Sequence, residues 1–314
     1  MTGGVGFDGS SVRAVGGGSL FSGSMEPRAS FTVPYADGEG LELGRRTAVM
    51  GILNVTPDSF ADGGRFTDAG EALGAAARMI EAGVDIIDVG GESTRPGAAP
   101  VGEAEETERV VPAIEAIKRE MPVRVSVDTR KAGVARRALD AGADMVNDVS
   151  GLRDPEMLPL VGERRVPVVV MHMRGTPATM QRETGYDDLP GSIVGFLRER
   201  VEAAAEAGIA EDKILVDPGI GFGKSTDGNL SILGRLGALA GLGRPLLIGA
   251  SRKTFIGALL DLPVEQRLEG SLAVAGFAAA EGAHVIRAHD VEATVRVVRM
   301  IDAIRDAARP SSVA

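Results

Sequence analysis

The segment VPVVVMHM, residues 166–173, is an apolar run interrupted only by a histidine near its end. An apolar run of this length without alternating polar residues is typical of a parallel strand that is covered on both faces. Seven further runs of this kind occur along the chain, and a helical stretch separates each run from the next. The eight runs span residues 47–55, 85–91, 123–129, 145–149, 166–173, 214–217, 245–251 and 285–290.

Eight strands that alternate with helices predict an α/β fold, a TIM (β/α)8 barrel. A doubly wound open sheet is the main alternative, because hydrophobic periodicity does not distinguish the two folds. The helical stretches support the alternation. Apolar residues recur with helical spacing from Leu73 to Ile80, and Gly83, Gly142 and Gly208 lie where helix C-caps are expected.

The domain boundaries follow from composition. No Pro/Ser-rich linker interrupts the pattern, so we expect one barrel domain over residues 46–308. The first 24 residues contain eight glycines and show no periodicity. We therefore expect residues 1–45 to be a disordered Gly/Ser-rich extension, and residues 309–314 to be a short tail.

Composition excludes several classes of function. The 314-residue chain has no cysteine, which rules out disulfide scaffolds, thiolate zinc sites and cysteine nucleophiles. Its net charge of −10 is poorly suited to nucleic acid or an anionic membrane surface. The apolar runs are too short to span a membrane. We expect a cytoplasmic protein with neither nucleic-acid nor membrane partners.

Polar side chains lie at the carboxyl end of every run. In a barrel these positions meet at one mouth, where such enzymes hold their substrates. The plainer interpretation is that polar residues mark strand ends before loops. The residues, in chain order, are Asn54; Glu92, Thr94 and Arg95; Asp128; Asn147 and Asp148; His172; Asp217; Ser251, Arg252 and Lys253; and Arg287, His289 and Asp290.

The chemistry of these side chains divides into two groups. Asp128, Asn147 and Asp217 provide acceptors, and Asn147 also donors, which suits a heterocycle with an amidine-like edge. The second group consists of donors, mostly cationic, which suit phosphate oxygens. Its members are Thr94, Arg95, Lys253, Arg287 and His289. The sequence therefore predicts a polar ring deep in the barrel with an anionic tail at its rim.

Other familiar motifs either do not match this sequence or allow more than one role for their residues. The segment DPGIGFGKS, residues 217–225, matches neither a P-loop nor a dinucleotide fingerprint, although its glycines allow close approach of a ligand. Lys253 is compatible with a Schiff-base lysine, but the Asp/Asn set fits a bound heterocycle better. Of the histidines, His284 precedes the last strand and is interpreted as structural, and we favour a non-ligand role for His172.

Eight motifs in the same order resemble those of the dihydropteroate synthases, a family of pterin-binding barrels. They cover essentially residues 47–307. Position 254 is Thr where the family commonly has Ser, and position 288 is Ala where Val is usual. The motifs are GILNVTPDSF (51–60), DVGGESTRPG (88–97), SVDT (126–129), NDVSG (147–151), MHMRG (171–175), DPGIGFGK (217–224), SRK (251–253) and RAHD (287–290).

The resemblance implies a TIM barrel, usually a homodimer, that condenses 6-hydroxymethyl-7,8-dihydropterin diphosphate with p-aminobenzoate. The products would be 7,8-dihydropteroate and pyrophosphate, in folate biosynthesis. The implied mechanism is Mg²⁺-assisted departure of diphosphate and attack of the arylamine on the pterin methylene cation.

The resemblance also implies roles for individual residues. Asp128, Asn147, Asp217 and Lys253 would hold the pterin; Thr94, Arg95, Arg287 and His289 would hold the diphosphate; and Asn54 would ligate Mg²⁺. Phe60, Arg95, Pro96, Phe222 and Thr254 would form the p-aminobenzoate pocket. Asp62, Arg95 and Lys253 are the implied catalytic residues, with Asp62 beside the cation. We hypothesise that the loops bearing residues 51–64 and 90–97 close over bound diphosphate.

Three other functions compete with this one. A pterin-binding methyltransferase barrel shares the ring-holding set but needs no grip on diphosphate, so the cationic residues argue against it. A non-catalytic paralogue should lack residues of the loop motifs, and none is visibly lost. A structural or regulatory barrel would have only an incidental pocket.

Overall fold

The structure, a computed structural model, describes residues 28–56, 65–95 and 97–308. The strands are β1 (Phe31–Pro34), β2 (Gly40–Leu43), β3 (Ala48–Asn54), β4 (Ile86–Gly90), β5 (Arg124–Asp128), β6 (Met145–Asp148), β7 (Val168–Met171), β8 (Ile214–Asp217), β9 (Leu247–Ile248) and β10 (Val285–Ala288). The α-helices are α1 (Arg65–Glu81), α2 (Glu103–Glu120), α3 (Ala132–Asp140), α4 (Met157–Arg164), α5 (Leu189–Glu206), α6 (Thr226–Leu233), α7 (Thr254–Leu260), α8 (Leu268–Ala280) and α9 (Val291–Ala307).

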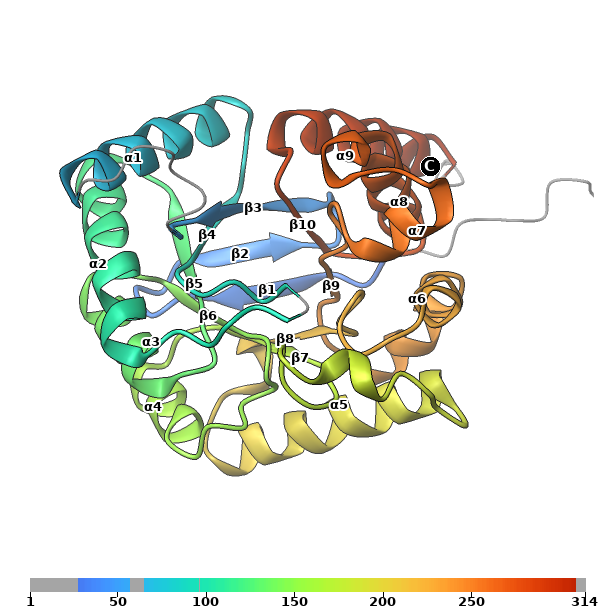
Figure 1. Cartoon of the computed structure of the whole chain (residues 1–314), viewed down its shortest axis with the longest axis horizontal. Helices are drawn as coiled ribbons and strands as arrows, with labels where there is room; N and C mark the ends of the chain where they lie inside the picture. Colours follow the sequence, from blue (N-terminus) through green and yellow to red (C-terminus); the bar gives the residue numbers. More distant parts are fainter. Residues whose placement is uncertain (1–27, 57–64, 96, 309–314) are drawn as a thin grey trace, which may run out of the picture.

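Strands β3 to β10 form one parallel sheet that closes on itself. The order along the sheet is β8-β7-β6-β5-β4-β3-β10-β9. Its two ends meet where Val216 bridges Leu246, and the Val216 amide donates to the Pro245 carbonyl at 3.0 Å. Figure 1 shows the helices arranged as a ring around these strands. The predicted TIM barrel is confirmed, and the open doubly wound sheet is excluded by the closure.

All eight predicted strands are present, with bounds that differ by a few residues. Strand β9 is the shortest, because the chain leaves the sheet at Gly249 and turns through Arg252, whose φ is +56°. The predicted helix ends are also confirmed. Gly83, Gly142 and Gly208 all have positive φ, and each amide donates to a carbonyl in the last turn of the preceding helix.

Strand periodicity divides the barrel into an apolar lower half and a polar upper half. Alternate residues of each strand point inward. At the amino ends, the inward positions hold apolar side chains such as Ile86, Met145, Leu215 and Val285, which form one buried cluster. Outward positions pack against the helices in a larger core. The barrel interior is therefore filled at its lower end and open to polar chemistry only at the carboxyl ends.

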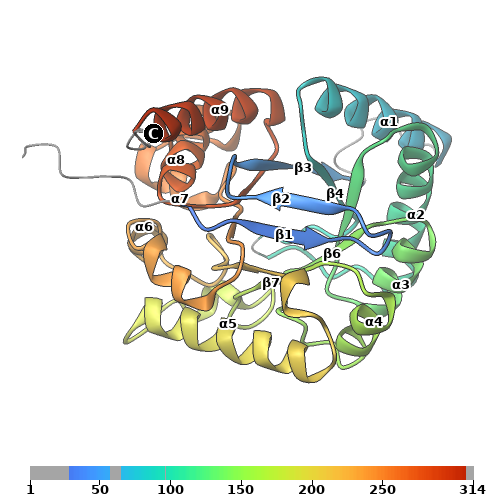
Figure 2. The same ribbon diagram turned by 180° about the vertical axis from the view of Figure 1, so that it is seen from behind.

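An antiparallel hairpin, β1–β2, covers the amino end of the barrel. Val33 and Leu43 are buried in the same cluster as the inward apolar residues of the barrel. His284 Nε2 lies 3.0 Å from the Ala29 carbonyl, and Lys213 Nζ donates to the Pro34 carbonyl. Figure 2 shows the hairpin lying across this end. The hairpin thus plugs this end of the barrel and buries the apolar side chains at the amino ends of its strands.

This hairpin corrects the predicted disordered extension over residues 1–45. The prediction was wrong for residues 28–45, because Phe31, Val33, Leu41 and Leu43 alternate with more exposed residues and bury an apolar face. Residues 1–27 and the predicted tail at 309–314 lie outside the described residues. No helix in the described ranges combines the length and the apolar character that crossing a membrane requires.

Candidate active site

Polar side chains gather inside the barrel at the carboxyl ends of its strands, and we call this group the polar cup. Four of them lie two positions beyond an inward apolar residue of the same strand, as Asp88 follows Ile86 and Arg287 follows Val285; Asp128 likewise follows the buried Ser126. A strand repeats its facing direction every two residues, so these side chains also point inward. The members of the polar cup are Asp88, Asp128, Asn147, Asp217, Arg287 and, from the loop after β9, Lys253.

Arg287 links two carboxylates of the polar cup. Its Nε donates to Asp88 Oδ2 at 2.6 Å, and one terminal nitrogen donates to Asp128 Oδ2 at 2.6 Å. Asn147 Nδ2 donates to the same Asp88 oxygen at 2.9 Å. These residues come from four strands, β4, β5, β6 and β10, so the barrel closure itself brings them together. The expectation that Asp128, Asn147 and Arg287 meet in space is met.

Two carboxylate oxygens of the polar cup are left for a ligand. Asp88 Oδ1 and Asp128 Oδ1 are buried and have no hydrogen-bond partner among the described residues. Burial raises the pKa of Asp128 to about 7, although the Arg287 charge opposes the shift. A buried acceptor without a donor is unfavourable by about 1–3 kcal/mol, and a ligand N–H would remove that penalty. The polar cup is therefore prepared to accept hydrogen bonds.

Asp217, Lys253 and Phe222 form the opposite wall. Burial raises the pKa of Asp217 to about 6, and the Gly219 amide donates to its Oδ1 at 2.6 Å. Burial together with the Arg287 charge lowers the pKa of Lys253 to about 8. Lys253 Nζ lies 3.8 Å from the centre of the Phe222 ring. An ammonium over an aromatic face gains a favourable cation–π interaction. The contact links Lys253, which we predicted to hold the pterin, to Phe222, which we predicted to hold p-aminobenzoate.

His289 lies beside the polar cup but does not carry the positive charge that we expected. Its Nδ1 lies 3.1 Å from the Ser251 hydroxyl oxygen. Burial of the imidazole and the charges of Arg287 and Lys253 lower the pKa of His289 to about 4, although the residue as a whole is exposed. The side chain is therefore neutral at pH 7. A neutral imidazole still provides one N–H donor for an anion.

Asn54 stands at the end of β3, at the mouth of the barrel. A Cβ built on Gly90 would lie 3.6 Å from Asn54 Oδ1 and 3.7 Å from Asp128 Oδ2, so Gly90 keeps open the space between them. The described residues contain no cluster of three or more His, Cys, Asp or Glu side chains that would hold a metal by itself. Mg²⁺ commonly takes few protein ligands and completes its shell with phosphate and water. One amide oxygen at this mouth fits that pattern.

The other predicted residues are not tied to the polar cup. Within the described residues, the side chains of Thr94 and Arg95 make no hydrogen bond or ion pair, and Arg95 is exposed. Thr254 is exposed at the start of α7. The predicted residues Phe60, Asp62 and Pro96 lie outside the described residues.

Sequence reasoning missed a buried ion-pair network beneath the loop that carries Thr94 and Arg95. Glu92 accepts hydrogen bonds from the Val101 amide at 2.9 Å and from Lys131 Nζ at 3.0 Å. Lys131 also contacts the fully buried Glu106. Glu92 therefore fastens both ends of the 92–101 loop to the segment that follows Asp128.

The same reasoning missed Asp88 as a site residue. It lies inside an apolar run rather than at its end. The available signal was a lone carboxylate in the segment IIDVG, at a position that shares its face with the apolar Ile86.

The two remaining histidines are both buried. Burial lowers the pKa of His172 to about 3 and that of His284 to about 4, so both rings are neutral. His284 Nδ1 accepts from the Leu246 amide at 3.1 Å, which places it at the plugged end in the structural role that we predicted.

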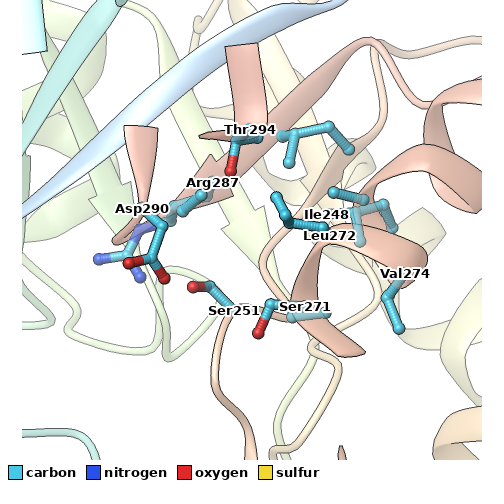
Figure 3. A pocket seen from close by; sticks show the side chains of 12 residues that line it. Ile248, Ser251, Ser271, Leu272, Val274, Arg287, Asp290 and Thr294 are labelled. Carbon is cyan, nitrogen blue, oxygen red and sulfur yellow. The ribbon is translucent and has the colours of Figure 1, made fainter. Parts of the chain in front are cut away.

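Behind the polar cup lies a small apolar cavity of about 10 Å³. Figure 3 shows Arg287, Asp290 and Ser251 on one side and Ile248 and Leu272 on the other, with the Arg287 guanidinium directed away from the apolar lining. A space of this size is about that of one water molecule, so the cavity does not hold a substrate. It lies between the strands and α8, behind the wall of the site.

Comparisons with known proteins agree with the geometry. A family of proteins described as pterin binding enzymes matches residues 50–289. Dihydropteroate synthase from Escherichia coli strain K12 is 48% identical over 269 residues, which cover 86% of this chain and 95% of that protein.

Solved structures are similar too. A Xanthomonas albilineans dihydropteroate synthase with 4-aminobenzoic acid has a TM-score of 0.82 at 45% identity, covering 88% of this chain and 99% of that one. A structure from the same organism with 7,8-dihydropteroate has a TM-score of 0.76 at 44% identity, covering 83% and 94%. With this fold, this polar cup and these relatives, the chain belongs to the dihydropteroate synthase family of pterin-binding enzymes.

Proposed function

We propose that the chain joins 6-hydroxymethyl-7,8-dihydropterin diphosphate to p-aminobenzoate and releases 7,8-dihydropteroate and pyrophosphate. The observation that carries the proposal is the pair of buried, unpartnered oxygens, Asp88 Oδ1 and Asp128 Oδ1, in a cup that also holds Asn147 and Asp217. A pterin presents several N–H donors along its pyrimidine edge, and ionised carboxylates are pure acceptors. The ring therefore satisfies groups that the protein itself leaves unsatisfied.

Arg287 acts in this proposal mainly as the residue that orients the carboxylates. Two of its N–H groups are used by Asp88 and Asp128, and the guanidinium has five. The remaining donors are available to a diphosphate oxygen, as the resemblance implies. The positive charge of Arg287 is already balanced by two carboxylates, so Lys253 is the more effective cation for the departing group.

The reaction breaks the bond between the pterin methylene carbon and the diphosphate oxygen, which leaves with the electron pair. The arylamine nitrogen then forms the new bond to that carbon and loses a proton. Neutral His289 donates an N–H to the leaving anion, and the bound anion raises the pKa of His289 from about 4. We also propose that Asn54 is a ligand of Mg²⁺, which when bound neutralises charge on the diphosphate.

For p-aminobenzoate we propose the face formed by Phe222 and Lys253. The ammonium of Lys253 covers one face of the Phe222 ring, so the benzoate ring packs beside the ammonium, against the edge of Phe222. The resemblance also assigns Arg95, Pro96, Phe60 and Thr254 to this pocket, and it assigns Asp62 to stabilisation of the cation. These roles stay predictions.

The test is synthesis of dihydropteroate by the purified chain, measured by separating the product from both substrates. Asp128→Ala removes an acceptor of the ring, and Arg287→Ala removes the link between Asp88 and Asp128. We expect each change to lower kcat/KM by at least about a hundredfold, since two charged hydrogen bonds are lost. A wild-type chain that forms no product, or variants with unchanged turnover, would disprove the assignment.

We propose further that the chain is a homodimer that uses helices α7, α8 and α9. Apolar side chains on these helices are exposed: Leu259 (58%), Leu260 (47%), Phe277 (46%), Met300 (64%) and Ile304 (50%). The three helices are neighbours on one side of the barrel in Figure 1. Exposed apolar groups gathered in one region are typical of a protein interface.

Light scattering should give the mass of two chains for the wild type and of one chain for Phe277→Asp. A wild-type chain of single mass contradicts the proposal. The cytoplasmic location stays a prediction from the sequence.

A further inference from the structure

Lys224 lies beneath the polar cup and takes no part in the proposed reaction. Only 3% of its surface is exposed. Its Nζ donates to the Phe222 carbonyl at 2.8 Å and to the His172 carbonyl at 3.3 Å, and lies 3.0 Å from His172 Nδ1. An ammonium has three N–H groups, and here it meets three acceptors. Lys224 therefore joins the end of β7 to the loop that follows β8.

This arrangement is unfavourable in itself. Among the described residues, no carboxylate forms an ion pair with Lys224, and burial lowers its pKa to about 7, although the nearby Asp217 charge opposes the shift. A buried charge without a contacting counter-charge destabilises the folded state; a methionine of similar volume would avoid that penalty but would leave the Phe222 and His172 carbonyls without this donor. Lys224 thus offsets the cost of burying its charge by hydrogen bonds to two segments, and its position directs attention to the segment that it holds.

The held segment is the Gly219–Phe222 turn, which has no freedom to move toward β7. Gly219 has a φ of +70°, and a Cβ at this position would lie 2.0 Å from the His172 carbonyl oxygen. A Cβ at Gly221 would lie 2.9 Å from Lys253 Cδ. The turn is therefore packed between His172 and Lys253.

Phe222 is fixed from both ends by lysines. Lys224 binds its carbonyl from inside the protein, and Lys253 lies over its ring on the substrate side. Phe222 is otherwise 5% exposed, so its ring has a defined place. A loss of the inner contact would free the Phe222 carbonyl, while Gly221 and Gly223 keep their hydrogen bonds to Asn229 and Tyr186 and Lys253 stays in the polar cup.

We infer that Lys224 is a positioning residue for the aromatic second substrate: it fixes the turn that presents Phe222 to p-aminobenzoate. The inference rests on the proposed function and assigns a determinant of affinity for one of its two substrates. Lys224 does not touch either substrate and acts through Phe222.

The test uses steady-state kinetics with each substrate varied in turn, for the wild type and for Lys224→Met. We expect KM for p-aminobenzoate to rise about tenfold or more, as expected when a binding contact is loosened, with kcat changed less than about threefold. The dissociation constant of the pterin alone should change less than about twofold. In a Phe222→Leu background, Lys224→Met should raise KM no further, because its effect passes through the Phe222 ring.

Lys213→Met is the matched control. Lys213 also donates to a backbone carbonyl, that of Pro34, but at the plugged end of the barrel. It should leave both KM values unchanged. If Lys224→Met does not fold, Lys224→Gln, which keeps two N–H donors, should give a smaller rise in the same KM.

The outcomes separate the two proposals. A wild-type chain without synthase activity contradicts the proposed function itself. An active wild type whose Lys224 variants keep the KM for p-aminobenzoate, or lose affinity for both substrates equally, overturns the inference. An effect of Lys224→Met that adds fully to Phe222→Leu overturns it as well.

Discussion

Replacing Arg287 by Met tests whether the polar cup is held together by charge. The change keeps an unbranched side chain but removes the partner of Asp88 and Asp128, both of which contact the guanidinium at 2.6 Å. Asp88 is fully buried and Asp128 nearly so, with side-chain exposures of 0% and 8%. Removing one partner from a buried ion pair costs about 3–5 kcal/mol, because the remaining charge is uncompensated. We expect a loss of that size in the free energy of unfolding at pH 8.5.

The loss should depend on pH in a definite direction. Asp128 has a pKa of about 7 in the folded protein, above its ordinary value of 3.8, so its contribution to stability declines as pH rises through this window. Arg287 opposes that shift, so without it the pKa of Asp128 rises further. At pH 6 Asp128 is mostly protonated in both proteins. Each added pKa unit then increases the loss above pH 7 by up to about 1.4 kcal/mol.

The measurement is urea unfolding followed by circular dichroism at pH 6 and pH 8.5, with Arg252→Met as the matched control. Arg252 forms a similar two-point pair with Asp290, at 2.9 and 2.6 Å, but the two side chains are 31% and 23% exposed. Solvent screens that pair, so its loss should cost less than about 1 kcal/mol. Equal losses for the two variants, or a loss for Arg287→Met that shrinks as pH rises, would refute this account of the polar cup.

Three further predictions follow from the site and the fold. The affinity for the pterin, measured by calorimetry, should fall as pH drops from 8 to 5.5, because Asp128 and Asp217, with pKa values of about 7 and 6, become protonated and lose the charge that strengthens their hydrogen bonds to the ring; a flat profile contradicts their role. Glu92→Gln should raise KM for the pterin diphosphate by about tenfold through a loosened 92–101 loop, with little change in the affinity for the unphosphorylated pterin; equal effects on both ligands would exclude this positioning role. Leu43→Ala should lower the free energy of unfolding by about 2–5 kcal/mol while specific activity is retained, whereas a loss below about 0.5 kcal/mol would mean that the hairpin does not plug the barrel.

The barrel could be predicted because its signal is local and repeated. Each strand is a short apolar run with a polar residue near its carboxyl end, and eight repeats of that pattern leave few folds that accommodate them. The β1–β2 hairpin escaped prediction because each strand has only four residues. Its apolar face can be interpreted only when the open lower end of the barrel is known, because the cluster that it covers consists of residues from strands throughout the chain.

The residues of the candidate site also differ in whether their signal is local in the sequence. Asp128, Asn147, Asp217 and Lys253 could be predicted because their own positions carry the signal. The residues that were missed make their decisive contacts with residues far away in the sequence. Asp88 holds Arg287 across 199 positions of sequence, and Lys224 holds His172 across 52.

The charge state of the site was the least predictable property. The sequence placed His289 among the mostly cationic donors for the diphosphate, but burial of the imidazole, together with the charges of Arg287 and Lys253, lowers its pKa to about 4, and only the folded barrel sets those surroundings. Arg287 is likewise balanced by two carboxylates that lie on other strands. The residue type determines which charge a side chain can carry. Its neighbours in the fold determine whether the side chain is ionised and whether its charge is already paired. For an enzyme that binds an anion and then releases it, the second property determines which side chains can act on the leaving group.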